Sequence, residues 1–84
     1  MEKRIITEKL TTIFRDVFKD KSMVLNDDLS SNSVEKWNSL THMVLLNSVE
    51  NEFGIKFKLK DLMKIKTVGD LISIIYSYKN EENN

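Results

Sequence analysis

The sequence predicts an all-α protein, and two observations carry this prediction. The 84 residues contain no proline and only two glycines, the two residue types that most disfavour the interior of a helix. Apolar residues also recur at the 3.6-residue period of an amphipathic helix near the start, the middle and the end of the chain. A chain of this length forms a single domain. We expect that domain to span residues 1–80 and the polar residues 81–84 to form a frayed tail.

The first predicted helix runs from about residue 2 to residue 18. Its apolar side chains fall on one stripe, which we expect to face the core: Ile6, Leu10, Ile13, Phe14 and Val17. The charged residues of the segment fall elsewhere on the helix and can stay solvated.

A long loop is predicted at residues 19–38, where the helical period fails. The segment is rich in serine, asparagine and aspartate, whose side chains bond to nearby backbone groups and compete with helix formation. An ordered loop of this length is usually functional or held against the core. Five apolar residues are the expected anchors, Trp37 foremost among them: Val24, Leu25, Leu29, Val34 and Trp37.

The second predicted helix begins after Asn38, a favourable N-cap residue, and ends near Phe53, where Gly54 supplies a stop. At 100° per residue, one arc carries the core face: Leu45, Leu46, Val49 and Phe53, with His42 at its edge. A second apolar group lies on the opposite side together with two asparagines: Leu40, Met43, Val44, Asn47 and Asn51. A short surface helix needs only one apolar stripe, so the second stripe requires another explanation.

Residues 55–66 connect the second helix to the last one. Apolar residues alternate with lysine at the start of this segment, which is typical of a strand. A single strand in a helical protein has no partner, so we expect an extended connection followed by a short helical turn near residues 61–64. Phe57, Leu62 and Ile65 are its expected buried residues.

The last predicted helix has the clearest start. Thr67 and Asp70 have the spacing of a capping box, and Asp70 lies near the positive end of the helix dipole. The expected buried face of this helix follows directly: Val68, Leu71, Ile72, Ile75 and Tyr76.

Composition excludes several classes of function. Thirteen basic residues balance thirteen acidic ones, whereas a protein that binds nucleic acid normally has a basic excess. The chain has no cysteine and one histidine, which excludes disulfides, zinc–thiolate sites and a multi-histidine metal site. No apolar run reaches the roughly 18 residues that span a bilayer, and the N-terminus lacks the apolar block of a signal peptide. We therefore expect a cytoplasmic monomer that binds neither nucleic acid nor membrane.

Catalysis is not expected from this chain. Ser39 and His42 lie at positions i and i+3 of one helix, which is the spacing of a conceivable Ser–His dyad, but nothing marks an orienting third residue. We interpret His42 as a polar residue at the edge of the core. Ser39 is more informative, because a hydroxyl in the first turn of a helix lies beside unpaired backbone N–H groups that favour a phosphate. Serine is also a common helix cap, so this signal is weak alone.

Several of these residues match one known family in register, and the sequence resembles the acyl and peptidyl carrier proteins over roughly residues 3–78. The tetrapeptide Trp37-Asn38-Ser39-Leu40 is similar to the attachment motif of that family, usually Asp-Ser-Leu. The other matches lie on both sides of it: Asp28, Leu29, Leu45, Leu46, Val49, Glu50, Phe53, Phe57, Ile65, Thr67 and Val68. The resemblance implies a four-helix bundle of acyl-carrier type with a long first loop and a short third helix.

The resemblance also implies a function. The chain would be a stand-alone carrier with a covalent 4′-phosphopantetheine arm on Ser39, delivering an acyl or aminoacyl group as a thioester in fatty acid or secondary metabolite biosynthesis. The implied partners are a phosphopantetheinyl transferase, an adenylating enzyme that loads the arm, and enzymes that process the acyl group. The implied docking residues lie on and just before the second helix: Asn38, Leu40, Met43, Val44 and Asn47.

Three departures from the family pattern favour a specialised pathway over housekeeping fatty-acid synthesis. Asn38 stands where the family usually has aspartate, the second helix has acids only at Glu50 and Glu52, and the segment after it is rich in lysine. One alternative is an unmodified, carrier-like interaction module in which Ser39 is only a cap. Another is an amphipathic module that binds a membrane surface through the lysine-rich segment.

Overall fold

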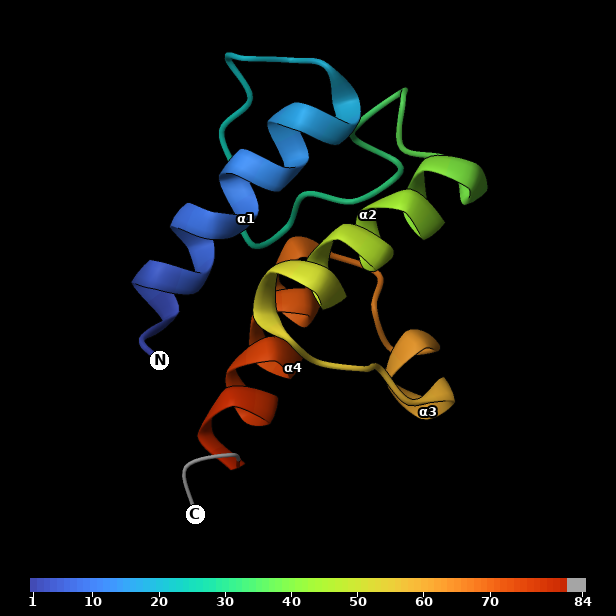
Figure 1. Cartoon of the computed structure of the whole chain (residues 1–84). Helices are drawn as coiled ribbons and strands as arrows, with labels where there is room; N and C mark the ends of the chain where they lie inside the picture. Colours follow the sequence, from blue (N-terminus) through green and yellow to red (C-terminus); the bar gives the residue numbers. More distant parts are fainter. Residues whose placement is uncertain (82–84) are drawn as a thin grey trace.

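The computed structural model describes residues 1–81 of the chain, and the described residues form four helices and no strand. The helices are α1 (Lys3–Phe18), α2 (Ser39–Phe53), α3 (Leu59–Leu62) and α4 (Val68–Glu81). α1 packs against both α2 and α4, while α3 lies in the connection between α2 and α4 (Figure 1). The predicted all-α architecture, with its long first loop and short third helix, is confirmed. Of the predicted tail, residues 82–84 lie outside the described residues.

A single apolar core joins α1, α2 and α4. The residues predicted to face it are buried in all three helices, except that Val17 and Tyr76 are half-buried and Phe18 takes the buried position at the end of α1. The full set of buried apolar residues also includes the loop and the connection: Ile6, Leu10, Ile13, Phe14, Phe18, Trp37, Leu45, Leu46, Val49, Phe53, Ile55, Ile65, Val68, Leu71, Ile72 and Ile75.

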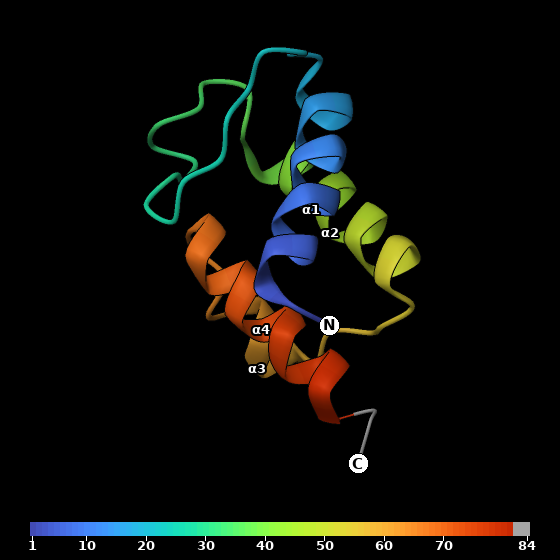
Figure 2. The same cartoon turned by 90° about the vertical axis from the view of Figure 1, so that its left-hand side faces the viewer.

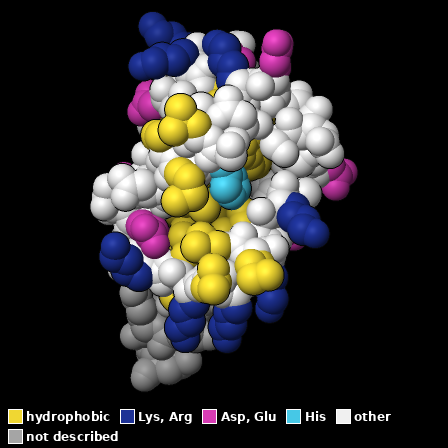
Figure 3. Space-filling model, turned by 90° about the vertical axis from the view of Figure 1, so that its right-hand side faces the viewer, with side chains coloured by type: hydrophobic (Ala, Val, Ile, Leu, Met, Phe, Trp, Pro, Cys, Tyr) yellow, Lys and Arg dark blue, Asp and Glu magenta, His cyan; other side chains and the backbone are white. Residues whose placement is uncertain are grey.

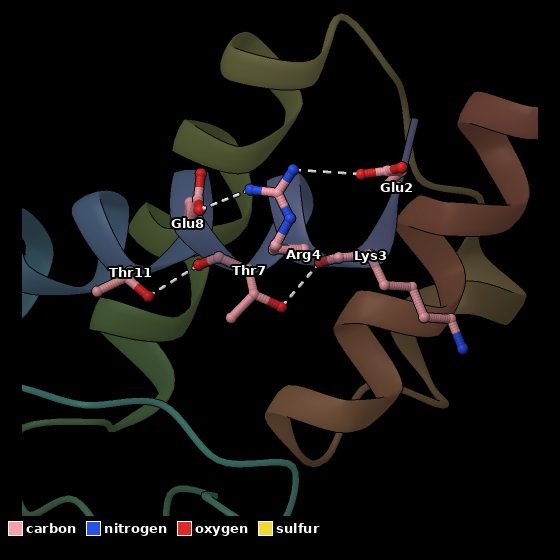
Figure 4. A network of polar contacts seen from close by, with 6 residues as sticks. All are labelled: Glu2, Lys3, Arg4, Thr7, Glu8 and Thr11. Atoms are coloured by element: carbon pink, nitrogen blue, oxygen red, sulfur yellow. Dashed lines mark hydrogen bonds and ion pairs between the residues drawn. The ribbon is translucent and has the colours of Figure 1, made fainter.

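The first half of α1 carries a network of exposed and part-buried polar contacts (Figure 4). Arg4 pairs with Glu8 at 3.1 Å and with Glu2 at 3.3 Å. The hydroxyl of Thr11 donates to the carbonyl of Thr7 at 2.8 Å. Exposed ion pairs of this kind contribute about 0–1 kcal/mol each. The buried stripe, and not this network, therefore holds α1 in place.

The loop of residues 19–38 is held both to the core and to the start of α4 (Figure 2). Trp37 is 3% exposed and packs edge-on against Phe14, with ring centroids 5.4 Å apart. The N–H of Val68 donates to the carbonyl of Leu29 at 2.9 Å. The prediction that Trp37 anchors the loop is confirmed: its C-terminal end packs against α1 through Trp37, and its middle is bonded to the start of α4 through Leu29.

One of the predicted loop anchors is wrong. Val24 is 73% exposed, and Met23 packs against the core in its place, while Leu25, Leu29 and Val34 are half-buried as expected. In a loop without a helical repeat, adjacent side chains diverge, so a local contact must decide which of them faces inward. Here Nε of Arg15 donates to the carbonyl of Met23 at 2.8 Å and fixes the backbone at that residue.

α3 begins two residues before the predicted turn. The carboxylate of Asp61 accepts hydrogen bonds from the N–H of Lys58 at 3.3 Å and from the hydroxyl of Tyr78 on α4. These bonds cap the helical turn so that it begins at Leu59. The hydrogen bond from Tyr78 is the largest cause that lowers the pKa of Asp61 below its usual value. Of the predicted buried residues, Ile65 is buried, whereas Phe57 and Leu62 are half-buried; residues 55–58 before α3 belong to no helix or strand, and Lys58 is extended.

The capping box predicted at the start of α4 is confirmed. The N–H of Asp70 donates to the Thr67 hydroxyl at 3.1 Å, and the N–H of Thr67 donates to the Asp70 carboxylate at 3.1 Å. A hydrogen bond from the N–H of Lys66 is the largest cause that lowers the pKa of Asp70, and the hydrogen bonds with Thr67 add to this effect. Within residues 1–81, no helix combines the length and the apolar character needed to cross a bilayer.

Candidate functional site

α2 begins at Ser39 because Asn38 and Thr41 cap each other. The Asn38 side chain accepts the N–H groups of Leu40 and Thr41, both at 3.0 Å, and the N–H of Asn38 donates to the Thr41 hydroxyl at 2.8 Å. The favourable N-cap predicted at Asn38 is confirmed. The residue whose side chain accepts the Asn38 N–H is a threonine, whereas a capping box usually has Glu or Gln at that position. The sequence pattern therefore did not reveal this second hydrogen bond.

Ser39 is the first residue of the helix and is exposed. Its hydroxyl makes no hydrogen bond to any other residue that the structure describes. The side chain of Asn38, and not that of Ser39, caps the helix, so the alternative in which Ser39 serves only as a cap loses its basis. The Ser39 hydroxyl is accessible to a reagent that approaches from solvent.

An open pocket of about 490 Å³ lies beside Ser39. Three separate segments line its polar wall: Ser30, Ser31 and Asn32 from the loop, Ser39 and His42 from α2, and Lys66 from the connection before α4. The buried side chains of Trp37 and Ile65 supply its apolar lining. The loop residues of this pocket were not predicted from the sequence, because only the folded loop brings them to the start of α2.

His42 is held at the edge of this pocket by Trp37. The indole Nε1–H donates to Nδ1 of His42 at 2.9 Å, and the two rings stack with centroids 6.0 Å apart. An indole N–H can only donate, so Nδ1 of His42 carries no proton and the neutral ring has its proton on Nε2. Burial lowers the pKa of His42 and favours this neutral form.

The Ser–His dyad considered from the sequence is therefore excluded in this arrangement. Nδ1 of His42 is occupied by Trp37, and Nε2 already carries the proton, so neither nitrogen can accept one from Ser39. Within the described residues, no group of three or more His, Asp or Glu side chains could hold a metal ion.

The residues predicted for docking lie together on the outer side of α2. Leu40 is 74% exposed, Met43 62% and Val44 48%, and Asn47 is exposed beside them. Asn38 lies at the same end, with its side chain turned back into the cap. The hydrophobic side chains gather around the single histidine, with lysine or arginine side chains below them (Figure 3).

Two further apolar residues, one at the start of α3 and one directly after it, were missed from the sequence. Leu59 is 73% exposed and Met63, at the end of the same turn, is 71% exposed. Their spacing of four residues places them on one face of a helical turn, which is a signal that the sequence did contain. Lysines alternate with them at Lys58, Lys60 and Lys64, so basic side chains border this apolar face.

Three comparisons with known proteins agree with this arrangement. A profile of the family described as "Phosphopantetheine attachment site" matches residues 8–75. An acyl carrier protein of Thermotoga maritima is 38% identical over 73 residues, which cover 87% of this chain and 80% of the relative.

Among solved structures, a holo acyl carrier protein from Geobacter metallireducens superposes with a TM-score of 0.85 at 42% identity, over 90% of this chain and 87% of that one. A putative acyl carrier protein from Mycobacterium tuberculosis has a TM-score of 0.76 over 86% of this chain and 96% of that one. At 21% identity, this second likeness concerns the fold alone.

Proposed function

The chain belongs to the phosphopantetheine-binding family of acyl carrier proteins, and we propose that Ser39 is the residue to which its arm is attached. Members of this family are carriers and not catalysts, and their covalent prosthetic group is 4′-phosphopantetheine. One observation carries the proposal for Ser39: its hydroxyl is exposed at the first residue of α2 and is not used by the helix cap.

The surroundings of Ser39 fit a phosphodiester and a polar arm. The pocket beside it combines hydroxyl and amide side chains with the ammonium group of Lys66. A negative charge at the start of α2 is also favoured by the dipole of that helix. The arm supplies a thiol that forms the thioester, which this chain cannot supply because it has no cysteine. Ser39 contributes the attachment oxygen, and its activation falls to the transferase.

The proposed role is delivery of an acyl or aminoacyl group to partner enzymes. A flexible arm raises the effective concentration of its cargo at each partner, because each transfer takes place within one complex. The proposed docking face consists of Asn38, Leu40, Met43, Val44 and Asn47, extended by Leu59 of α3 and by Met63, which caps α3.

The partners that fit this face are enzymes with an apolar docking surface bordered by carboxylates. Lys58, Lys60 and Lys64 are exposed next to Leu59 and Met63, so a partner surface rich in acids is complementary to them. We propose a phosphopantetheinyl transferase and an adenylating loading enzyme as partners, in a specialised cytoplasmic pathway. The neutral net charge of the chain and the absence of acids from the first turn of α2 support that choice.

The test is modification by a permissive phosphopantetheinyl transferase with coenzyme A, followed by intact-mass and peptide mass spectrometry. We expect one arm per chain, located on Ser39, and none on the Ser39→Ala variant, with helicity unchanged. Ser73→Ala is a matched control, because Ser73 is an exposed serine on α4, and it should be modified like the wild type. Addition at another residue would contradict the assignment of Ser39, and no addition would support the unmodified interaction module instead.

A further inference from the structure

We propose that His42 binds the phosphodiester of the arm, with its Nε2–H donating a hydrogen bond to a phosphate oxygen on Ser39. This inference rests on the proposed attachment at Ser39. It gives His42 a ligand contact in addition to its hydrogen bond with Trp37.

The position of the proton on the imidazole ring is fixed by Trp37. The Trp37 indole donates to Nδ1 at 2.9 Å, and the near-parallel rings, 21° apart, hold the imidazole in one orientation. Because an indole cannot accept a hydrogen bond, this contact leaves Nε2–H as the only donor of the neutral ring. A hydrogen bond to one ring nitrogen commonly sets the role of the other.

The Nε2–H donor has no partner within the described part of the chain. The ring of His42 makes no hydrogen bond to the described residues other than the one from Trp37. The residue is only half-buried, and it lines the pocket that also contains Ser39. An oriented donor at the wall of an open pocket is suited to an acceptor that arrives from outside.

His42 lies three residues after Ser39 on α2. Residues three apart on a helix lie on the same face, with Cβ atoms about 5–6 Å apart. A phosphate bonded to the Ser39 hydroxyl therefore lies next to the imidazole. Lys66 lines the same pocket, but its exposed, flexible ammonium group attracts the charge without fixing a direction.

Two substitutions separate this role from a structural one. His42→Gln keeps an oxygen that can accept from Trp37 and an amide N–H that can donate to phosphate. His42→Leu keeps the approximate volume of the side chain and removes both the hydrogen-bond acceptor and the donor. Asn51→Leu, at an exposed position of α2 outside the pocket, is the matched control for an added apolar side chain.

The experiment compares each protein before and after modification by the transferase, with mass spectrometry confirming one arm on Ser39. Nitrogen-15 NMR of the imidazole should show the Nε2–H form in the apo protein and a shift of the Nε2 signal in the holo protein. The phosphorus-31 resonance of holo His42→Leu should move away from that of the wild type, whereas holo His42→Gln and Asn51→Leu should stay close to it.

The outcomes distinguish the two proposals. If Ser39 carries the arm but the Nε2 signal of the wild type is the same in both states, the His42 contact is wrong and the attachment stands. This comparison needs no variant, so it holds even if His42→Leu fails to fold. If no arm is added to Ser39, both proposals fall.

Discussion

The N–H of Gly69 in the first turn of α4 donates to the backbone carbonyl of Asp27 at 3.0 Å. The bond joins α4 to the loop that precedes α2, beside the bond between Val68 and Leu29. The approach is close, because a Cβ atom at position 69 would lie 3.1 Å from the Asp27 carbonyl oxygen and 3.2 Å from its Cβ. The neighbouring loop therefore favours glycine at this position, although the backbone of Gly69 is helical.

The first prediction concerns Gly69→Ala. Helix propensity alone would make alanine better by about 1 kcal/mol. Because the added methyl group meets the backbone of Asp27, which cannot turn aside as a flexible side chain would, we expect a net loss of about 1 kcal/mol. Denaturant unfolding measures this change. Ser73→Ala, at an exposed site on the same helix, should be neutral or slightly stabilising, and a stabilised Gly69→Ala protein would contradict the close contact.

The second prediction separates the two faces of α2. Leu46 and Phe53 are 4% and 3% exposed, so Leu46→Ala and Phe53→Ala should each cost about 2–5 kcal/mol of unfolding free energy. Val44 is 48% exposed, and Val44→Asp should leave stability within about 0.5 kcal/mol of the wild type while weakening the docking of partner enzymes. A Val44→Asp protein as unstable as Leu46→Ala would show that the assignment of the faces is wrong.

The third prediction concerns pH. Burial lowers the pKa of His42 in the folded state below the ordinary value of 6.5, so the unfolded chain takes up a proton first as the pH falls. The stability that depends on neutral His42 is complete above about pH 6.5 and is lost as the pH falls toward the folded pKa. Unfolding free energies measured from about pH 7 to about pH 5 should fall. The decrease in unfolding free energy should be smaller in His42→Gln than in the wild type. The same dependence on pH in both proteins would assign the titration to another group.

The fourth prediction tests the part of the docking face that α3 provides. Leu59→Ser and Met63→Ser remove exposed side chains, so both variants should keep wild-type stability. Loss of an apolar anchor from an interface costs at least about 1 kcal/mol, so kcat/KM of the transferase should fall about fivefold or more. Val24→Ser removes a side chain that is 73% exposed on the loop before α2, outside the proposed docking face, and should have no effect. Equal rates for all three variants would restrict the docking face to α2.

Helices and caps were predictable because their signals are local. The stripes of α1 and α2 depend only on periodic spacing, and the box between Thr67 and Asp70 depends on two residues three apart. Gly54 ends α2 with a φ of 66°, a conformation that its identity already indicated.

The pocket and the loop were not predictable, because they depend on contacts between distant segments. Nothing local distinguishes Met23 from Val24, and the choice between them is made by Arg15 from the preceding helix. The contact of Trp37 with His42 likewise needs the turn between them to be in place. The position of Ser39 could be found from its motif, but its neighbours across the pocket could not.

The hydrogen bond between Trp37 and His42 also makes Trp37 an intrinsic fluorescence probe of the pocket. Trp37 is the only tryptophan of the chain, and its indole is buried against Phe14 and Phe18 while its N–H reaches the pocket beside Ser39. Indole fluorescence responds to the polarity and hydrogen bonding of its surroundings. We therefore expect attachment of the proposed arm at Ser39 to be followed in unlabelled protein, in real time, as a change in the emission of a single residue.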